Sequence, residues 1–267
     1  MSVSVVIPAL NEEATIAHVV WACLADEPAE VIVIDADSQD ATARLAVDAG
    51  ARVINWRSVL GHVPVRAGKG ESLWRGIEAA RGDIVAFVDA DLESAAPGLV
   101  SALAAPFEAE SINLVKASYS RTFGDQPTGG GRVTELTAKP LLSMYFPELG
   151  HINQPLGGEY AIRRSVARQL PFVDGYGVEA GLMIDVAQRF GADSITQVDL
   201  PPRVHRNRPL HQLAPMAHVV AETILSRAQF YGRLGKAGSQ TFGQRPPLDE
   251  LVSGIESTGV SQSQEAM

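Results

Sequence analysis

The first half of the chain alternates short β-branched runs with longer segments in which apolar residues recur at helical spacing. The runs predict strands, and the segments between them predict amphipathic helices. Strands are expected at Val3–Ile7, Glu30–Ile34, Ala51–Asn55, Asp83–Val88 and Ile112–Ala117. Helices are expected at Glu12–Ala25, Ala41–Ala49, Lys69–Ala80 and Pro97–Ala105. This order predicts an α/β fold, in which a mostly parallel sheet is covered by helices on both faces.

The second half of the chain has a different pattern. From about Thr128 a glycine run leads into a helix expected at 132–145, followed by an irregular stretch rich in Gly and Pro and by helices expected at 179–190 and 213–234. Beyond Gly235 large apolar residues are scarce, so burial there cannot offset the entropy lost on ordering. We therefore expect one domain with halves at 1–127 and 128–235, and a disordered tail at 236–267.

Composition narrows the classes of partner and compartment. The chain has 267 residues and a formal net charge of −9, which argues against a nucleic-acid partner. Cys23 is the single cysteine, so an intrachain disulfide framework is excluded. No cationic segment precedes an apolar stretch at the N-terminus and no window reaches the length of a membrane span, so a cytoplasmic protein without a membrane span is expected.

The helix expected at 213–234 carries a wide apolar stripe. Such a stripe is typical of a helix that packs on the core, and equally of one that forms a homodimer interface. The sequence leaves both interpretations open.

Three polar loops follow predicted strands, at residues 8–12, 35–40 and 89–91. Ligands of parallel sheets bind beyond the carboxyl ends of the strands, so the three loops are expected to line one cleft. Asp89 and Asp91, separated by one small residue, can hold a hard divalent cation on a diphosphate. The alternative is that both acids serve only as loop acids and helix caps.

Several motifs, in order, resemble a known enzyme family. The segments at 5–13, 34–42 and 89–91 resemble the nucleotide-sugar half of GT-A glycosyltransferases, which have a Rossmann-like sheet. The segments at 64–71, 129–136, 154–160, 175–179 and 205–210 look like those of the family of glucosyl-3-phosphoglycerate synthases and their mannosyl relatives. The resemblance spans about residues 3 to 234 and implies a retaining glycosyltransferase.

The resemblance also implies roles for individual residues. The residues implied at the nucleotide-sugar site are Pro8, Ala9, Leu10, Glu12, Asp37, Lys69, Asp89 and Ala90. Asp91 and His205 would hold Mg²⁺ or Mn²⁺ on the diphosphate, so that the cation stabilises the leaving group. Glu179 would face the donor sugar as a catalytic residue beside Asp91. The family usually has Asp-Ser-Gly-Ser where this chain has Asp35-Ala36-Asp37-Ser38, which leaves uridine or guanosine open as the base.

The implied acceptor is small and anionic. Gly131, Arg132, Val133, Thr134 and Asn207 would bind the phosphate and carboxylate of 3-phosphoglycerate. A glycine run that enters a helix suits this task, because backbone N–H groups, the helix dipole and a guanidinium can all face one anion. The alternatives are a flexible loop with a surface Arg132, a solvated basic loop around His205, and helix-surface acids at Glu179 and Asp185.

The leading hypothesis is therefore transfer of a hexose, most plausibly glucose from UDP-glucose, to the 2-hydroxyl of 3-phosphoglycerate with retention. The alternatives are GDP-mannose as donor, a different phosphorylated or carboxylated acceptor, or an inverting GT-A enzyme with Glu179 or Asp185 as general base. A sugar-phosphate nucleotidyltransferase is disfavoured, because the loop at 8–12 lacks glycine. A non-enzymatic nucleotide-sugar sensor would not need both Arg132 and His205.

Overall fold

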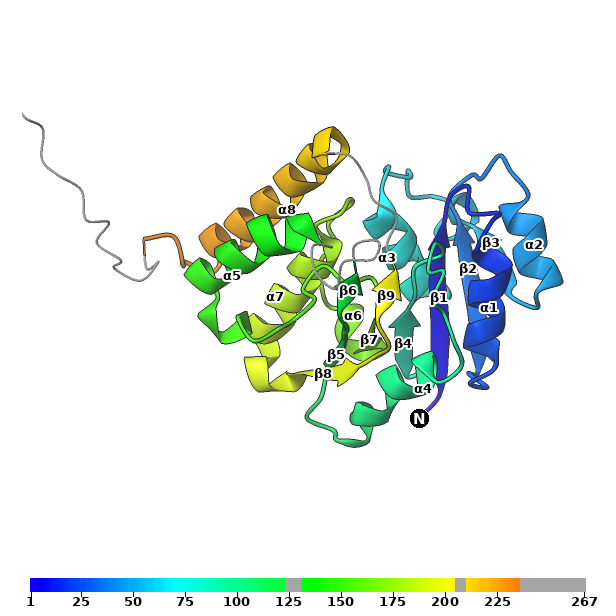
Figure 1. Cartoon of the computed structure of the whole chain (residues 1–267), viewed down its shortest axis with the longest axis horizontal. Helices are drawn as coiled ribbons and strands as arrows, with labels where there is room; N and C mark the ends of the chain where they lie inside the picture. The colour runs from blue at the N-terminus through cyan, green and yellow to red at the C-terminus, as the bar shows by residue number, and fades with distance from the viewer. Residues whose placement is uncertain (123–130, 205–209, 236–267) are drawn as a thin grey trace, which may run out of the picture. The chain divides into compact units, whose positions relative to one another are not determined.

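A computed structural model describes residues 1–122, 131–204 and 210–235 of the chain. The expected tail at 236–267 lies outside these ranges. A seven-stranded sheet has the strand order β3-β2-β1-β4-β7-β5-β8, and a separate pair joins β6 to β9 (Figure 1). The strands are β1 (Val3–Ala9), β2 (Glu30–Asp35), β3 (Arg52–Asn55), β4 (Ile84–Phe87), β5 (Leu114–Ser118), β6 (Arg121–Thr122), β7 (Tyr160–Arg163), β8 (Ile195–Asp199) and β9 (Arg203–Val204).

The large sheet is mostly parallel, as predicted. Only β7 runs antiparallel to its neighbours β4 and β5; the remaining pairings of this sheet are parallel. The helices are α1 (Ile16–Leu24), α2 (Thr42–Asp48), α3 (Lys69–Ala79), α4 (Leu99–Ala104), α5 (Lys139–Tyr145), α6 (Arg164–Ala167), α7 (Val178–Phe190) and α8 (Leu210–Phe230). Short 3-10 turns lie at Trp56–Ser58, Ala105–Glu108, Pro147–Leu149 and Ala192–Ser194, and a π-helical turn lies at Thr134–Ala138.

Alternate side chains of the central strands enter two hydrophobic cores. Val6 and Ile32 belong to the core under α3, α7 and α8, whereas Val5 and Val31 belong to the core under α1 and α4. This is the outcome of period-two alternation in strands that are buried on both faces. The apolar runs of the sequence therefore predicted the layers correctly, with helices on both faces.

The antiparallel strand β7 decides what lies at the functional edge of the sheet. Tyr160, at the start of β7, pairs with Phe87 near the end of β4 and with Lys116 of β5. The residues before β7 therefore lie beside the residues that follow β4. The sequence did not predict β7, because a strand of four residues directly after a Gly- and Pro-rich stretch looks irregular.

One helix begins later than its sequence pattern indicates. The prediction placed its start at Glu12, but α1 begins at Ile16. The backbone N–H of Glu12 donates to Thr42 Oγ1 and that of Glu13 donates to Asp40 Oδ2. These bonds to the neighbouring loop hold residues 12 and 13 outside the helix.

Across the described ranges, none of the helices combines the length and the apolar character that crossing a bilayer requires.

Candidate active site

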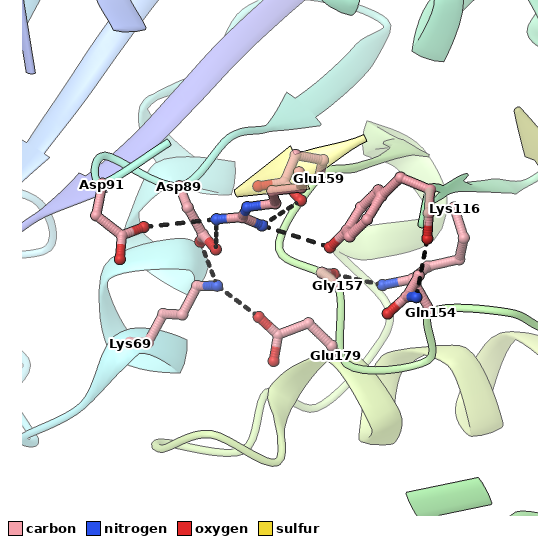
Figure 2. A network of polar contacts seen from close by, with 10 residues as sticks. Lys69, Asp89, Asp91, Lys116, Gln154, Gly157, Glu159 and Glu179 are labelled. Atoms are coloured by element: carbon pink, nitrogen blue, oxygen red, sulfur yellow. Dashed lines mark hydrogen bonds and ion pairs between the residues drawn. The ribbon is translucent and has the colours of Figure 1, made fainter. Parts of the chain in front are cut away.

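The first residue of α3 joins two carboxylates that are far apart in the sequence. Lys69 Nζ lies 2.5 Å from Asp89 Oδ1, beyond β4, and 2.7 Å from Glu179 Oε1, in the first turn of α7. Figure 2 shows the ammonium group between the two acids. Glu179 is 4 % exposed, so it is not a helix-surface acid. The structure therefore brings together three of the residues that the sequence singled out.

Arg203 of β9 extends this cluster to both aspartates. One terminal nitrogen lies 2.6 Å from Glu159 Oε2, and the other lies 3.4 Å from Asp89 Oδ2 and 3.6 Å from Asp91 Oδ1 (Figure 2). The guanidinium also donates to the hydroxyl of Tyr119 over 3.4 Å. Because Asp91 keeps a 37 % exposed side chain, it is the carboxylate of this cluster that faces outward most.

The ion pairs control the protonation of the cluster. Burial alone would raise the pKa of Asp89, but Lys69 and Arg203 outweigh burial and hold that pKa well below its usual range. Burial would lower the pKa of Lys69, yet Asp89 and Glu179 raise it well above its usual value. Asp89 is therefore anionic and Lys69 cationic at neutral pH.

A buried lysine supports the turn behind Asp89. Lys116 is 1 % exposed, and its Nζ donates to the carbonyl of Gly157 over 2.6 Å (Figure 2). The next residue, Gly158, packs so closely on Asp89 that a Cβ atom there would collide with the carboxylate. Burial lowers the pKa of Lys116 to about 8. This turn therefore fixes the position of Asp89 from behind.

Buried polar atoms around the cluster remain without a partner. Glu159 Oε1, Gln154 Oε1 and the Tyr160 hydroxyl are buried, and no hydrogen-bond partner for them lies within the described ranges. Buried polar groups are normally paired, and an ordered water is the usual partner where the protein offers none. Burial also raises the pKa of Glu159.

The loops after β1 and β2 form one continuous surface. The side-chain oxygen of Asn11 accepts a hydrogen bond from the backbone N–H of Gln39 over 2.8 Å. The backbone N–H of Asn11 donates to Ser38 Oγ over 3.0 Å. The predicted nucleotide-sugar residues of the first loop are exposed Leu10, half-buried Pro8 and Glu12, and buried Ala9. In the loop after β4, Ala90 is buried.

Asp37 occupies the position where the resembling family usually has glycine, and its φ is +67°. Aspartate is among the few residues that tolerate this left-handed conformation. Arg57 Nη2 lies 2.7 Å from its carboxylate, and Asn55 donates to it over 3.0 Å. The pKa of Asp37 is lowered to about 2, mainly because Arg57 donates a hydrogen bond to the carboxylate. Its negative charge is therefore offset locally.

The predicted acceptor residues stand at the start of one helical segment. Gly131 has a φ of +75°, and the N–H of Glu135 donates to its carbonyl over 2.9 Å. Arg132 is half-buried, whereas the side chains of Val133 and Thr134 are buried. Val133 packs in the core, so only its backbone is suited to meet a ligand. Asn207 and His205 lie outside the described residues.

Asp185, one of the alternatives for a general base, has a structural contact. Its carboxylate accepts from Arg227 Nε over 2.9 Å and from the Tyr231 hydroxyl over 2.9 Å, and the residue is 1 % exposed. It therefore ties α7 to α8 and belongs to the packing of these helices.

The sequence reasoning assigned no role to Arg203, Glu159 or Lys116. Lys116 interrupts an otherwise apolar strand pattern, and a charged residue there is a signal of a buried partner. Glu159 lies within the motif at 154–160, and Arg203 precedes the motif at 205–210. Their contacts join segments that are remote in the chain, and no spacing in the sequence indicates them.

The fold and this cluster together define a glycosyltransferase of the GT-A class. Residues 4–170 match the model of glycosyl transferase family 2. The glucosyl-3-phosphoglycerate synthase of Mycobacterium tuberculosis (strain CDC 1551 / Oshkosh) is 50 % identical over 240 residues, which are 85 % of this chain and 73 % of that protein. The synthase of Mycolicibacterium smegmatis (strain ATCC 700084 / mc(2)155) is 44 % identical over 272 residues, 94 % of this chain and 90 % of that protein.

A crystal structure of the Mycobacterium tuberculosis synthase in complex with Mn²⁺, UDP-glucose and phosphoglyceric acid matches with a TM-score of 0.79 and 49 % identity, covering 85 % of this chain and 80 % of that one. The chain therefore belongs to glycosyl transferase family 2 and, within it, to the glucosyl-3-phosphoglycerate synthase family.

Proposed function

We propose that this enzyme transfers glucose from UDP-glucose to the 2-hydroxyl of 3-phosphoglycerate, with retention at the anomeric carbon and with a divalent cation. The observation that carries the proposal is the cluster of Lys69, Asp89, Asp91 and Glu179 at the carboxyl edge of the sheet. It occurs in a chain that is 50 % identical to a glucosyl-3-phosphoglycerate synthase. In this proposal residues 1–127 bind the donor and residues 128–235 bind the acceptor.

The oxygen atoms that the site offers as metal ligands suit Mg²⁺ or Mn²⁺. Both ions prefer carboxylate, phosphate and water oxygens and need only one or two protein ligands when a diphosphate supplies the others. Asp91 offers such a carboxylate, and His205 is the second ligand in this proposal. When bound, the cation neutralises charge on the departing diphosphate.

The protein's own residues position the substrates. Lys69 holds the carboxylates of Asp89 and Glu179 in fixed places, so that each can accept a hydrogen bond from a sugar hydroxyl. Because Glu179 is already paired with Lys69, orienting the sugar suits it better than nucleophilic attack. We therefore favour a same-face displacement, in which the acceptor proton passes to the departing diphosphate, over a covalent glycosyl-enzyme.

In this proposal the acceptor is bound by the helical segment that follows Gly131. The helical segment that begins after Gly131 directs its dipole at an anion, and the guanidinium of Arg132 fits phosphate or carboxylate oxygens. Thr134 and Asn207 complete the acceptor site. A cytoplasmic location follows from the same proposal, because both substrates are phosphorylated metabolites that do not cross membranes unaided.

The test is product formation from UDP-glucose and D-3-phosphoglycerate with Mg²⁺, with the product and its anomeric coupling read by NMR. The expected result is an α-linked glucosyl product. GDP-mannose and glycerate serve as comparison substrates, which separates the donor and acceptor questions. Metal-dependent binding of UDP-glucose without transfer to phosphoglycerate would overturn the acceptor assignment, and a β-linked product would overturn retention.

Two variants test the residue roles. Glu179→Gln should lower kcat about tenfold or more, because the amide loses its charge beside Lys69. Arg132→Ala should raise the KM for phosphoglycerate and leave UDP-glucose binding unchanged. Lys139→Ala, on the same helical segment and 37 % exposed, is the matched control. A fully active Glu179→Gln enzyme would remove this residue from the site.

A further inference from the structure

A basic hollow lies at the edge of the sheet opposite to Asp89. It is formed where β1 and β4 begin and where β7 ends, and it has a volume of about 630 Å³. The charged side chains around it are Arg81, Asp83, Arg163, Arg164 and Arg168. The whole chain has a formal net charge of −9. The hollow is locally basic in contrast, because four arginines and one aspartate line it.

Asp83 is the one acidic residue among those that line the hollow, so its single negative charge can offset only one of the four guanidinium groups. Asp83 already accepts from the backbone N–H of Ser2 over 2.8 Å and from its hydroxyl over 3.0 Å. Arg163 donates to carbonyl oxygens, those of Ile112 over 2.7 Å and Phe107 over 3.0 Å. Carbonyl groups fix the orientation of a guanidinium but leave its full positive charge in place.

The remaining arginines keep donors for a ligand. Within the described ranges, the side chain of Arg164 makes one hydrogen bond, from its Nε to the carbonyl of Ile77 over 3.1 Å. Arg168 pairs with Glu78 over 2.6 Å, at a site where both side chains are more than 40 % exposed. For the side chain of Arg81, which is exposed, the described part of the chain provides no ion pair. Within the described ranges, the side chains of Arg81 and Arg164 therefore have no anionic partner, whereas Glu78 offsets the charge of Arg168.

We propose that this hollow is a binding site for a small phosphorylated anion, separate from the catalytic cleft. Guanidinium forks match phosphate oxygens in a bidentate manner, and Arg164, whose Nε is held by a backbone carbonyl, has no other side-chain contact within the described ranges.

The experiment is a titration of the ¹⁵N-labelled full chain with inorganic phosphate, followed through backbone amide signals. The amides of Gly82 and Ser165 report on the hollow, and those of Arg132 and Thr134 report on the acceptor site. We expect saturable shifts at Gly82 and Ser165. Sodium chloride at the same ionic strength should not reproduce them, because it screens charge without bidentate contacts.

Variants assign the binding to the arginines. The double variant Arg81→Ala/Arg168→Ala should weaken phosphate binding in the hollow about tenfold. Arg44→Ala, at a 67 % exposed arginine on α2, should not change it. Arg132→Ala should leave the shifts at Gly82 and Ser165 intact, so failure here is distinguishable from failure of the proposed acceptor site. The spectra themselves report whether each variant folds.

Two further arms distinguish the source of the phosphate. Glycerol 3-phosphate should bind with similar or higher affinity than inorganic phosphate, whereas sedimentation with phosphatidylglycerol vesicles should recover no protein. Recovery on vesicles that depends on Arg81 and Arg168 would overturn the small-anion assignment in favour of a membrane surface. Shifts that do not saturate, or that persist unchanged in the double variant, would overturn the site itself.

Discussion

The titration of buried Lys116 couples the stability of the protein to pH. Burial lowers its pKa from the ordinary 10.5 to about 8. Between these values the unfolded chain holds a proton that the folded chain has released, so the free energy of unfolding rises with pH across this window. Over the whole window the contribution is up to about 3 kcal/mol.

Lys116→Met removes this titrating group from the folded and the unfolded chain. In this variant the rise in unfolding free energy between about pH 8 and pH 10 should be smaller than in the wild type, because the titrating group is gone. Urea unfolding at a series of pH values measures it. The difference between the two proteins isolates Lys116 from all other titrating groups. Parallel pH profiles would show that the charge of Lys116 is not suppressed by burial.

Glu159 controls the charge that Arg203 presents to the aspartates. Glu159→Gln keeps the shape but removes the carboxylate nearest to Arg203, so that more of its positive charge acts on Asp89 and Asp91. We expect divalent-cation affinity in the presence of UDP to fall about tenfold, because the cation meets greater repulsion. A Mn²⁺ titration read by electron paramagnetic resonance measures it. Glu108→Gln, at an exposed carboxylate in the turn after α4, is the control, and equal affinities in both variants would contradict the prediction.

At the scale of elements, the start of α3 is fixed by a close backbone contact. The N–H of Gly70 donates to the carbonyl of Asp174 over 2.8 Å, and a Cβ atom at Gly70 would collide with the carbonyl of Val173. The neighbouring Lys69 depends on this contact for its position between Asp89 and Glu179. Glycine is therefore required here by space, although the backbone is helical.

Gly70→Ala is expected to destabilise the fold by about 2 kcal/mol or more, because rigid backbone must shift to make room. Thermal unfolding measures the effect. Gly61→Ala is the matched control, since its Cβ would meet the carbonyl of Arg57 at an ordinary 3.5 Å. Equal melting temperatures for the two variants would mean that the segment at 173–174 moves away at little cost.

At the scale of the molecule, the apolar residues of α8 divide into a part that packs in the core and a part that is exposed. Val220, Ile224 and Ala228 are fully buried, while Phe230 is 75 % exposed. Figure 1 shows α8 beside α5, on which it packs. One part of the predicted apolar stripe is therefore core, and the exposed part remains available for a second copy of the chain.

We expect the protein to form a homodimer through the exposed part of α8. Phe230→Asp should convert it to a monomer, because a symmetric dimer would bury the new negative charge of both subunits in one apolar contact. Sedimentation velocity at micromolar concentration measures the mass. Val47→Asp, at a 57 % exposed position on α2, is the control. A wild-type monomer, or a dimer that survives Phe230→Asp, would assign the exposed part of α8 to another role.

The sequence by itself determined the layers and the edge of the sheet where the site lies. Period-two and helical patterns are local, so they predicted the five strands β1 to β5 and most helices, and they placed Asp89 directly after a buried strand. The family motifs singled out Lys69 and Glu179, which the structure brings together.

Only the tertiary structure decided which groups surround these residues. Arg203 reaches Asp89 across 114 positions of the chain, and Glu159, which directly precedes the antiparallel strand β7, pairs with Arg203. Such contacts depend on how strands are ordered in the sheet, which no local periodicity encodes. The late start of α1 has the same origin, because side chains of a neighbouring loop bind the N–H groups of Glu12 and Glu13.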